Sequence, residues 1–542
     1  MRLRLVADTV RGHRVAIVLW MVLGAGTQFA VASMLTQEFN SAPGGGAALA
    51  PAVEAAAAAM RVLRWPAERL DTLGGYLTYH NILLLPLLLG LYAAILGSQV
   101  IRGDESRGTL QEILATGWSR LAVVRDRSLG VLAIFALIAI GITAGTYAGL
   151  AAGGAADLAG SVISVGEAAL CAFSFFALAL LVSQFTRSTR SATGVSALVM
   201  TALYVFTNVW QKAGLLAGLR FLSPFFYFQQ SRALVPGHAF DPMATLALVA
   251  ISAVLLAAAA WAFERRDYAS PLWSRRAGAE VLGPARVARP WLSSYWSAML
   301  VRQGLGLLAW SVGAAGFALL VVSLEPEVRK LWGDVEYLRR FIAPAGGGSL
   351  TDQYLSFTGE LLAPLAAAYA VTQVSAWITE LKQGRVELLL TTPVSWTRLL
   401  AERLAGLSVG VLIITASVVL GLVVGAIGAG VPLRADGIAR LVATTLLFGL
   451  AIGAVGALLA AWIRSELAAA LAAVFLTVSY LADLLAPAYQ WPAWISRLSI
   501  FDAFGRPYLQ MPETAGLGLL LGLAVVGFGA AAWLSERSPK VA

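Results

Sequence analysis

The residues that could bind nucleotide phosphates are few in this chain, and none has the neighbour that such a site requires. A phosphate-binding loop needs a lysine followed by serine or threonine. The four lysines are instead followed by Ala213, Leu331, Gln383 and Val541. The single cysteine, Cys171, and the three widely separated histidines do not have the spacing of a metal site. We therefore expect no catalytic residue, metal or cofactor in this chain.

A different chemistry, the docking of a helix on a partner, is indicated by a segment that occurs twice. The first copy reads RGDESRGTLQEILATGWSR (102–120) and the second ITELKQGRVELLLTTPVSWTR (378–398). The apolar residues of the first copy that share one helical face are Leu110, Ile113, Leu114 and Trp118. This pattern predicts a short amphipathic helix, which could lie on lipid or fit a groove on a cytoplasmic partner.

The charges and helix breakers around this segment support the helix. Asp104 and Glu105 precede it, where negative charge suits the helix dipole. Gly117 and Pro393 stand where the two copies should end.

Aromatic and polar residues inside apolar runs indicate a second candidate site, because polar groups are costly in lipid. The candidates for a substrate path are Tyr204, Phe206, Asn208, Trp210, Phe475, Tyr480 and Asp483. Aromatic walls suit flat amphiphilic molecules, although an aromatic stripe can equally be packing. Glu167 and Glu360 lie near the predicted outer ends of their runs, which favours interfacial solvation. Asp483 is the better candidate for a cavity or a helix pair.

The elements that carry these residues must be membrane helices. The chain has 542 residues, of which 59% are hydrophobic and 13% charged, far from the roughly 25% charged residues of soluble domains. We therefore predict an all-α integral membrane protein, because lipid offers no partner to unpaired backbone groups. The twelve predicted spans are 15–35, 81–101, 128–151, 165–186, 191–211, 243–263, 303–324, 360–379, 404–429, 440–463, 467–486 and 514–535.

The basic residues indicate the orientation of these spans. Lys and Arg exceed Asp and Glu by 39 to 30, and most basic residues fall on the connections that share a side with the N-terminus. By the positive-inside rule, both termini are expected in the cytoplasm. The positive charge is then a topology signal, and we expect no nucleic-acid partner.

The chain also reads as a tandem repeat. At one constant offset, Gly108 meets Gly384, and Arg127 meets Arg403. The motif Leu-Ser-x-Phe-x-x-Phe follows the fifth span of each half, at 222–228 and 498–504. We predict two parallel six-helix halves, 1–263 and 303–542, joined by a cytoplasmic linker with an interfacial helix, 264–302. A substrate path between the halves follows from this symmetry.

The duplicated segments resemble the coupling helices of ABC-2 type export permeases, which contact the ATPase, and the whole chain is similar to type V ABC exporters. The resemblance assigns docking to Glu105, Gly108, Leu110, Ile113, Leu114, Thr116, Glu387, Leu389, Leu390, Thr392 and Pro393. The second copy matches the family pattern closely. The first departs from it at Gln111 and Gly117, so the two docking contacts need not be equivalent.

The fused twelve-span form is similar to actinobacterial permeases described as exporters of polyketide antibiotics, some linked to multidrug efflux. The resemblance implies a bacterial plasma-membrane permease for amphiphilic drugs, antibiotics or lipid-like molecules. It implies two copies of a separate ABC ATPase subunit, which bind ATP and Mg. It also implies a re-entrant outer gate, here formed by Phe225, Phe228, Phe501 and Phe504.

Two other classes of protein remain open at this stage. A major-facilitator-type secondary drug transporter would also have twelve spans in two parallel halves. The long outer connections and the duplicated amphipathic segment argue against it. A membrane-anchoring or assembly protein is the third possibility, and a repeat that encloses a symmetric seam argues against that class.

Overall fold

The computed structural model describes two compact units, Met1–Val281 and Leu282–Ala542. The residues outside the description are 1–3, 42–43, 60–65, 187, 211–213, 238–239, 269, 273–293, 327, 330–347, 383, 392–393, 464, 466, 489–491 and 538–542. Within the rest of the chain, every regular element is a helix. The predicted all-α membrane fold is thereby confirmed.

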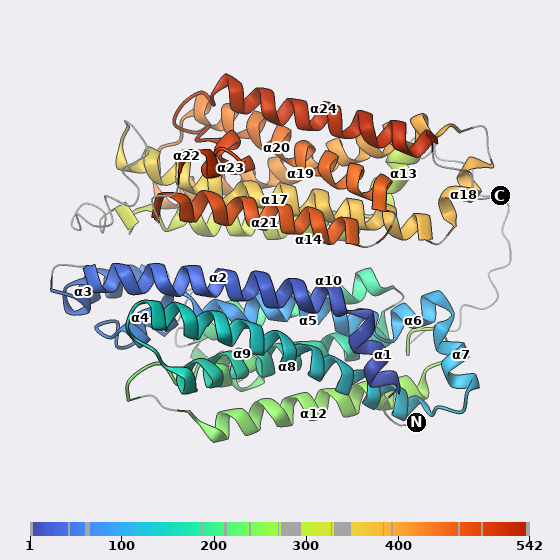
Figure 1. Ribbon diagram of the computed structural model, residues 1–542, viewed down its shortest axis with the longest axis horizontal. Helices are drawn as coiled ribbons and strands as arrows, with labels where there is room; N and C mark the ends of the chain where they lie inside the picture. The colour runs from blue at the N-terminus through green and yellow to red at the C-terminus, as the bar shows by residue number, and fades with distance from the viewer. Residues whose placement is uncertain are drawn as a thin grey trace. The chain divides into compact units, whose positions relative to one another are not determined.

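The first unit contains six long helical stretches and several short helices (Figure 1). The long ones are α2 (Arg14–Ser41), α4 (Leu73–His80) continued through η2 (Ile82–Leu84) into α5 (Leu85–Gln99), α8 (Arg120–Ala152), α9 (Leu158–Phe185), α10 (Thr189–Val209) and α12 (Pro242–Arg265). The short ones are α1 (Arg4–Gly12), α3 (Gly46–Ala59), α6 (Arg102–Arg107), α7 (Thr109–Ala115), η4 (Gly214–Leu222) and α11 (Pro224–Phe228).

The second unit has a closely similar set of elements. Its long helices are α14 (Gly304–Ser323), α17 (Leu350–Lys382), α19 (Trp396–Ala429), α20 (Ala435–Ile463), α21 (Leu467–Ala488) and α24 (Thr514–Arg537). Its short helices are α13 (Tyr295–Arg302), α18 (Arg385–Leu390), α22 (Ala493–Ser496) and α23 (Ile500–Phe504).

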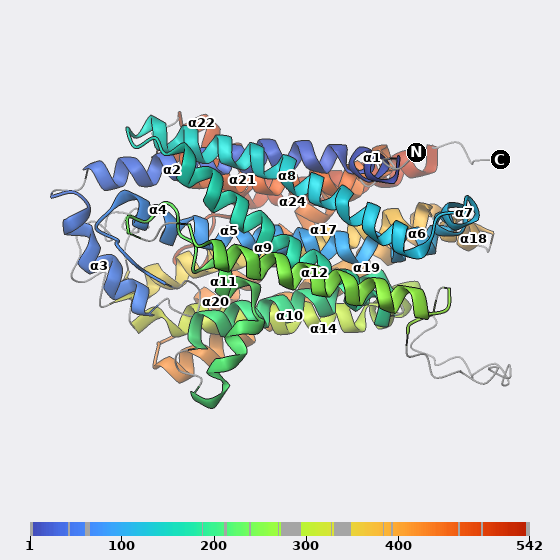
Figure 2. The same cartoon turned by 90° about the horizontal axis from the view of Figure 1, so that it is seen from below.

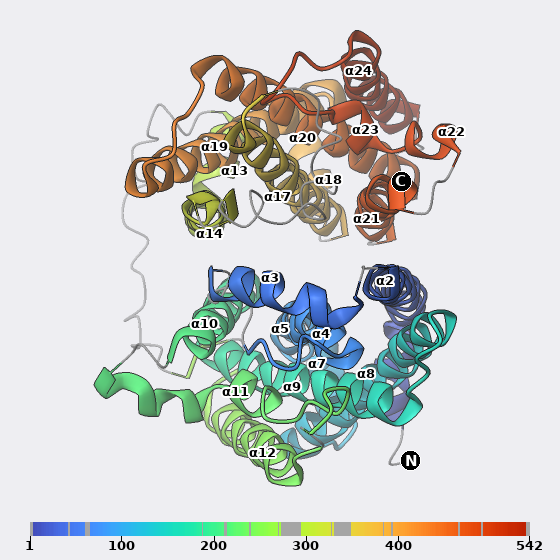
Figure 3. The same cartoon turned by 90° about the vertical axis from the view of Figure 1, so that its left-hand side faces the viewer.

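The helices pack in the same pairs in both units, which supports the predicted repeat. In the first unit α2 packs on α8, while α5 and α12 pack on α9. In the second, α14 packs on α19, while α17 and α24 pack on α20. The helices α10 and α21 also occupy matching places. In the first unit α10 contacts α5 and α9, and in the second α21 contacts α17 and α20. Figure 3 shows each bundle close to end-on.

Glycine allows the closest of these helix pairs to form. A Cβ atom at Gly145 of α8 would lie 2.1 Å from the carbonyl oxygen of Ala25 on α2. The repeat-related Gly421 of α19 would place a Cβ 2.1 Å from the carbonyl oxygen of Ala315 on α14. Backbones this close leave no room for a side chain, so both halves use the same small residue at the same contact.

Ten helices of the described residues are long and apolar enough to cross a membrane. These correspond to ten of the twelve predicted spans. The other two are also helices, α10 and α21. The apolar stretch of α21 is shorter, Leu467–Asp483, and α10 carries polar residues such as Ser196 and Asn208, which are buried within the first unit.

Several helices begin well before the predicted apolar stretch. The third span was expected at 128 and the ninth at 404, whereas α8 begins at Arg120 and α19 at Trp396. The reason is helix capping: the Ser119 Oγ accepts from the Ala122 N–H, and the Ser395 Oγ from the Arg398 N–H, both at 3.2 Å. Each helix therefore extends by about two charged turns beyond its apolar run.

Candidate docking site and its charge network

The predicted docking segment of the first unit is a corner between two short helices. Gly108 ends α6 and begins α7 with a φ of 80°, in the left-handed region that favours glycine. Gly384 has a φ of 67° immediately before α18 in the second unit. Two views place α6 and α7 at the same end of the first unit as α1, with α3 and α4 at the opposite end (Figures 1 and 2).

The apolar face of α7 is turned toward its own unit. Leu110 is fully buried, and Ile113, Leu114 and Trp118 pack against the core of the first unit. The exposed residues of this segment are Gln111, Glu112, Ala115, Thr116 and Gly117. The exposed surface of α7 is therefore mainly polar. The apolar side of the predicted amphipathic pattern is the side that packs on the first unit.

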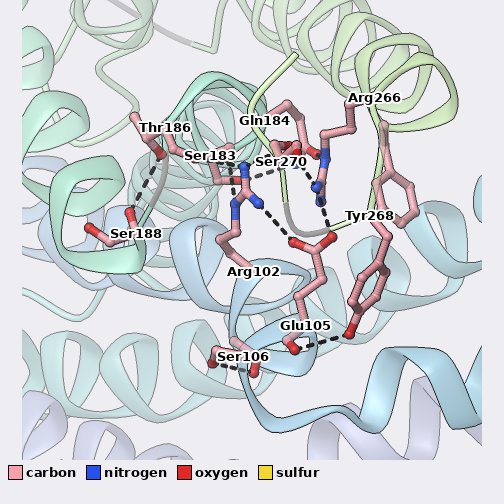
Figure 4. A network of polar contacts seen from close by, with 12 residues as sticks. Arg102, Glu105, Ser106, Ser183, Gln184, Thr186, Ser188, Arg266, Tyr268 and Ser270 are labelled. Carbon is pink, nitrogen blue, oxygen red and sulfur yellow. Dashed lines mark hydrogen bonds and ion pairs between the residues drawn. The ribbon is translucent and has the colours of Figure 1, made fainter. Parts of the chain in front are cut away.

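Glu105 lies between two buried arginines. It forms an ion pair of 3.0 Å with Arg102 and one of 2.7 Å with Arg266 (Figure 4). All three side chains are at most 5% exposed. Burial lowers the pKa of Arg102 and the nearby Arg266 lowers it further, while Glu105 raises it. A carboxylate shared by two buried guanidinium groups compensates charges that would otherwise be expensive to desolvate.

The two arginines connect the docking corner to other helix ends. Arg102 donates to the carbonyl oxygens of Ser183 (3.1 Å) and Thr186 (2.6 Å), at the end of α9. The Arg266 Nε donates to the Gln184 Oε1 at 2.7 Å, and the Tyr268 hydroxyl donates to the Glu105 carbonyl at 3.1 Å. Figure 4 shows these groups converging on Glu105. The corner is thus fixed to the α9–α10 turn and to the segment after α12.

A second ion pair fixes the corner to α1 and α8. Arg127 pairs with Asp104 at 2.8 Å and with Asp8 at 3.1 Å. It also donates to the Thr9 hydroxyl at 3.0 Å. Asp104 and Glu105 were expected to act on a helix dipole. In the structure they lie inside α6, one turn before the break at Gly108, and their partners are arginines.

The second unit keeps only part of this network. Glu380 pairs with Arg403 at 3.0 Å and accepts from the Tyr295 hydroxyl at 2.6 Å, which repeats the tie between the docking segment and the preceding interfacial helix. Ile378 and Leu381 stand at the positions related by the repeat to Arg102 and Glu105. Among the residues that the structure describes, a buried carboxylate shared by two arginines is therefore seen at the first docking segment and not at the second.

The second docking helix, α18, presents apolar surface outward. Leu388 is 70% exposed, while Leu389 and Leu390 are half-buried and Glu387 is exposed. The resemblance had assigned docking to Leu389 and Leu390 and had passed over Leu388. Thr392 and Pro393 lie outside the described residues.

The predicted outer-gate phenylalanines are packed inside their own units. Phe225, Phe228, Phe501 and Phe504 are all at most 5% exposed. The Phe225 ring lies 4.7 Å from Phe175 and 5.1 Å from Tyr204, measured between centroids. In the second unit the Phe501 ring lies 5.3 Å from Tyr480. Each outer segment is therefore locked to the helix that precedes it, α10 or α21.

Most of the candidate path residues take part in packing within their own unit. Asn208 is fully buried and accepts from the Gln229 amide at 2.9 Å. The Trp210 ring lies 3.9 Å from the Arg220 guanidinium carbon. Phe475 and Tyr480 pack partly buried against the core of the second unit. Phe206 and Asp483 are half-buried.

The two acids assigned to interfacial solvation have specific partners instead. Glu167 is only 4% exposed and accepts a hydrogen bond from the Thr245 hydroxyl of α12, so solvation was the wrong interpretation there. Glu360 is half-buried and pairs with Arg506 at 3.2 Å.

Sequence reasoning missed Arg102, Arg127 and Arg266 as partners of the docking acids. Arg127 could have been found, because the repeat aligns it with Arg403 while it aligns Asp104 with Glu380. Arg102 and Arg266 have no such signal, since the second half lacks their counterparts.

Comparisons with known proteins account for both units. Residues 7–268 match the family described as ABC-2 family transporter protein. Residues 292–534 match the family described as multidrug efflux system permease Rv1217c, C-terminal domain.

A named relative is similar over more than half of this chain and of its own length. The multidrug efflux system permease protein Rv1217c of Mycobacterium tuberculosis is 28% identical over 339 residues. The match covers 61% of this chain and 59% of that protein. The two family matches together leave few residues of the chain unassigned.

Proposed function

We propose that this chain, whose residues 7–268 match the ABC-2 family of transporter proteins, is the membrane subunit of an ATP-driven exporter. A separate ABC ATPase subunit docks on it, binds ATP and Mg, and supplies the energy. The relative named as a multidrug efflux permease supports amphiphilic drugs, antibiotics or lipid-like molecules as the substrate class. The plasma membrane, with both termini in the cytoplasm, is the proposed location.

The observation that carries this proposal is the way in which α6 and α7 are held. Leu110 and the buried Glu105 fix the corner to its unit, while Gln111, Glu112 and Ala115 stay exposed. A short helix with one face anchored and the other free can receive a force from a partner and transmit it. Surface loops without a role seldom bury three ionised groups, because desolvation is expensive.

The contacts of the corner indicate where such a force would go. A displacement of α7 would move Arg102 and Arg266. Arg102 donates to the carbonyl oxygen of Thr186, and Arg266 donates to the side-chain amide oxygen of Gln184, both at the end of α9. The turn there leads into α10, whose other end holds the outer segment through Asn208 and Gln229. ATP-driven motion at one membrane face can thereby reach the phenylalanine cluster at the other.

The second docking helix would act by a different route. It follows α17 after the break at Gly384, and Glu380 ties that end to Arg403 and Tyr295. We propose that each docking helix engages one ATPase copy, so that one chain assembles with two copies. The major-facilitator alternative has no use for either docking helix.

Cysteine cross-linking to the partner ATPase tests this proposal. In a Cys171→Ala background, single cysteines at Ala115 and Leu388 should each cross-link to the ATPase, because both positions are exposed on the docking helices. A cysteine at the buried Leu110 is the matched control and should not react. Absence of cross-links at both exposed positions, in membranes where the ATPase is present, would overturn the docking assignment.

A further inference from the structure

A groove of about 310 Å³ opens on the surface of the first unit between α8, α9 and α12. Leu121, Leu129 and Leu132 of α8 form one wall, and all three are more than 40% exposed. Phe173 of α9 forms the floor, and Ala257 and Ala260 of α12 form the other wall. The lining is apolar over most of its length, and it lies within helices long enough to cross a membrane.

The groove lies where α8 and α12 both pack on α9. Its wall on α12 is made of the small residues Ala257 and Ala260, which leave space that a larger side chain would fill. Volumes of this size are typical of ligand sites, and the exposed leucines of α8 are the kind of surface that lipid contacts in a membrane protein.

Two polar side chains interrupt the apolar lining at one end. The Ser128 hydroxyl is buried, with no hydrogen-bond partner among the described residues. Serines elsewhere in these helices donate to the carbonyl four residues earlier, as Ser98 does to Ala94 and Ser196 to Ala192, both at 2.7 Å. A buried hydroxyl without that bond is costly, and an acceptor in the groove would remove the cost once the Ser128 side chain rotates to expose its oxygen, which is covered in the structure.

The second polar side chain is Arg125, one helical turn before Ser128. Its guanidinium pairs with Asp126 at 2.7 Å and is 58% exposed, so it keeps donors for another partner. The cation, the hydroxyl and the apolar wall thus follow one another along α8. Three residues of helix separate the first two by about 4.5 Å.

We propose that this groove binds one phospholipid of the surrounding membrane. The phosphate lies at Arg125, and an acyl chain lies over Phe173 between α8 and α12. An ester carbonyl oxygen accepts from the Ser128 hydroxyl after that side chain rotates toward the groove. Charge complementarity supports this occupant, since a guanidinium recognises a phosphate strongly. The end of α8 that carries Arg125 is the predicted cytoplasmic end, so the lipid belongs to the inner leaflet.

The second unit provides an internal comparison. The repeat places Ala401 and Leu404 at the positions of Arg125 and Ser128. A phosphate site with the same chemistry is therefore expected once per chain, which distinguishes a built site from general contact with lipid.

Native mass spectrometry of the delipidated full chain, titrated with phosphatidylglycerol, tests the proposal. We expect one lipid to bind at least tenfold more tightly than the rest. Ala257→Trp should abolish that first binding step by filling the groove, and Arg125→Gln should weaken it about tenfold. The matched control is Ala253→Trp, an exposed alanine of the same helix outside the groove, which should leave binding unchanged.

Three results would overturn the proposal. One is an unchanged first lipid in Ala257→Trp. Another is an equal loss in Ala253→Trp. The third is displacement of that lipid by ethidium at lower concentration than by phosphatidylcholine, which would assign the groove to transported drugs. None of these outcomes depends on the ATPase, so failure here leaves the proposed export function standing.

Discussion

Glu105 is the carboxylate on which the first docking corner depends, because two buried guanidinium groups share it. Its loss would leave Arg102 and Arg266 buried beside one another. A buried ion pair adds little net stability compared with apolar packing, but removing one partner is expensive. The role of Glu105 is therefore to hold a defined geometry.

Replacement of Glu105 by glutamine should destabilise the first unit by about 3–5 kcal/mol, the usual cost of leaving a buried charge without its partner. The thermal unfolding midpoint of the purified chain measures this change. The exposed Glu112→Gln on the next helix is the control and should unfold at the parental temperature. Equal unfolding midpoints for Glu105→Gln and the parent would show that Glu105 does not form the two ion pairs described here.

Leu388 should contribute more to ATPase binding than either leucine that follows it, because it is 70% exposed. Burying a leucine side chain is worth about 1.5–3 kcal/mol. Leu388→Asp should therefore weaken ATPase binding roughly 10- to 100-fold. Binding can be measured by titrating the detergent-solubilised chain with the ATPase. Glu387→Gln is the control, and a stronger effect of Leu390→Asp would contradict the orientation of α18.

At this scale the sequence singled out two acids but did not predict what they contact. The motif marked Glu105 and Glu387, whereas the partners of Glu105 come from α6 and from beyond α12. The pair with Arg102 is local, three residues apart in α6, but the contact with the distant Arg266 depends on how the helices pack. Leu388 was missed for a related reason: in a six-residue helix the outward face is set by the turn at Gly384, and no periodic pattern is long enough to reveal it.

At the scale of elements, the docking corner depends on the break at Gly108. Its φ of 80° separates α6, which holds the charges, from α7, which offers the polar face. The sequence predicted one short helix with Asp104 and Glu105 ahead of it, whereas the structure places these acids in a separate helix, α6.

Gly108→Val should strain this corner by about 1–2 kcal/mol, because residues with a Cβ disfavour the left-handed region. We expect reduced stimulation of the ATPase by the permease, with membrane insertion unchanged. The control is Gly103→Ala, a glycine of α6 where an added Cβ meets only ordinary contacts, the nearest at 3.6 Å. Stimulation that falls equally in both variants would argue against a role for the break.

The long helices were predictable from the sequence, because apolar runs of this length have few alternatives. Their ends were predicted less well. The starts of α8 and α19 are set by the caps Ser119 and Ser395, which lie outside the apolar run. Two predicted spans, α10 and α21, do not meet the length and polarity criteria that the other ten meet. They nevertheless pack within their units as the other long helices do.

At the scale of the whole molecule, the two units are the same fold with different docking ends. The helices pack in matching pairs in the two units, and among the described residues the buried network of Glu105 is found in the first unit. If each of the proposed docking helices binds one ATPase copy, this inequality would give the two copies different contacts with the chain. The departures of the first copy at Gln111 and Gly117 predicted that the two docking contacts need not be equivalent, but they gave no sign of the buried network around Glu105.

The predicted path between the halves makes Phe206 and Tyr480 accessible to transported drugs. In a Cys171→Ala background, cysteines at these positions should react with a membrane-permeant thiol reagent, and ethidium should slow the reaction several-fold. A cysteine at Leu198, an exposed residue of α10 away from these aromatic groups, is the control. If ethidium protects neither position, the aromatic side chains serve only the packing seen with Phe501 and its neighbours.

Transport in proteoliposomes tests the central claim most directly. The chain and its ATPase partner are reconstituted together, and ethidium movement is followed with ATP alone, with a proton gradient alone, and with neither. We predict no ATP hydrolysis by the chain alone, and transport by the complex only when ATP is supplied. Transport by the chain without its partner, driven by the proton gradient, would contradict the account and identify a secondary transporter.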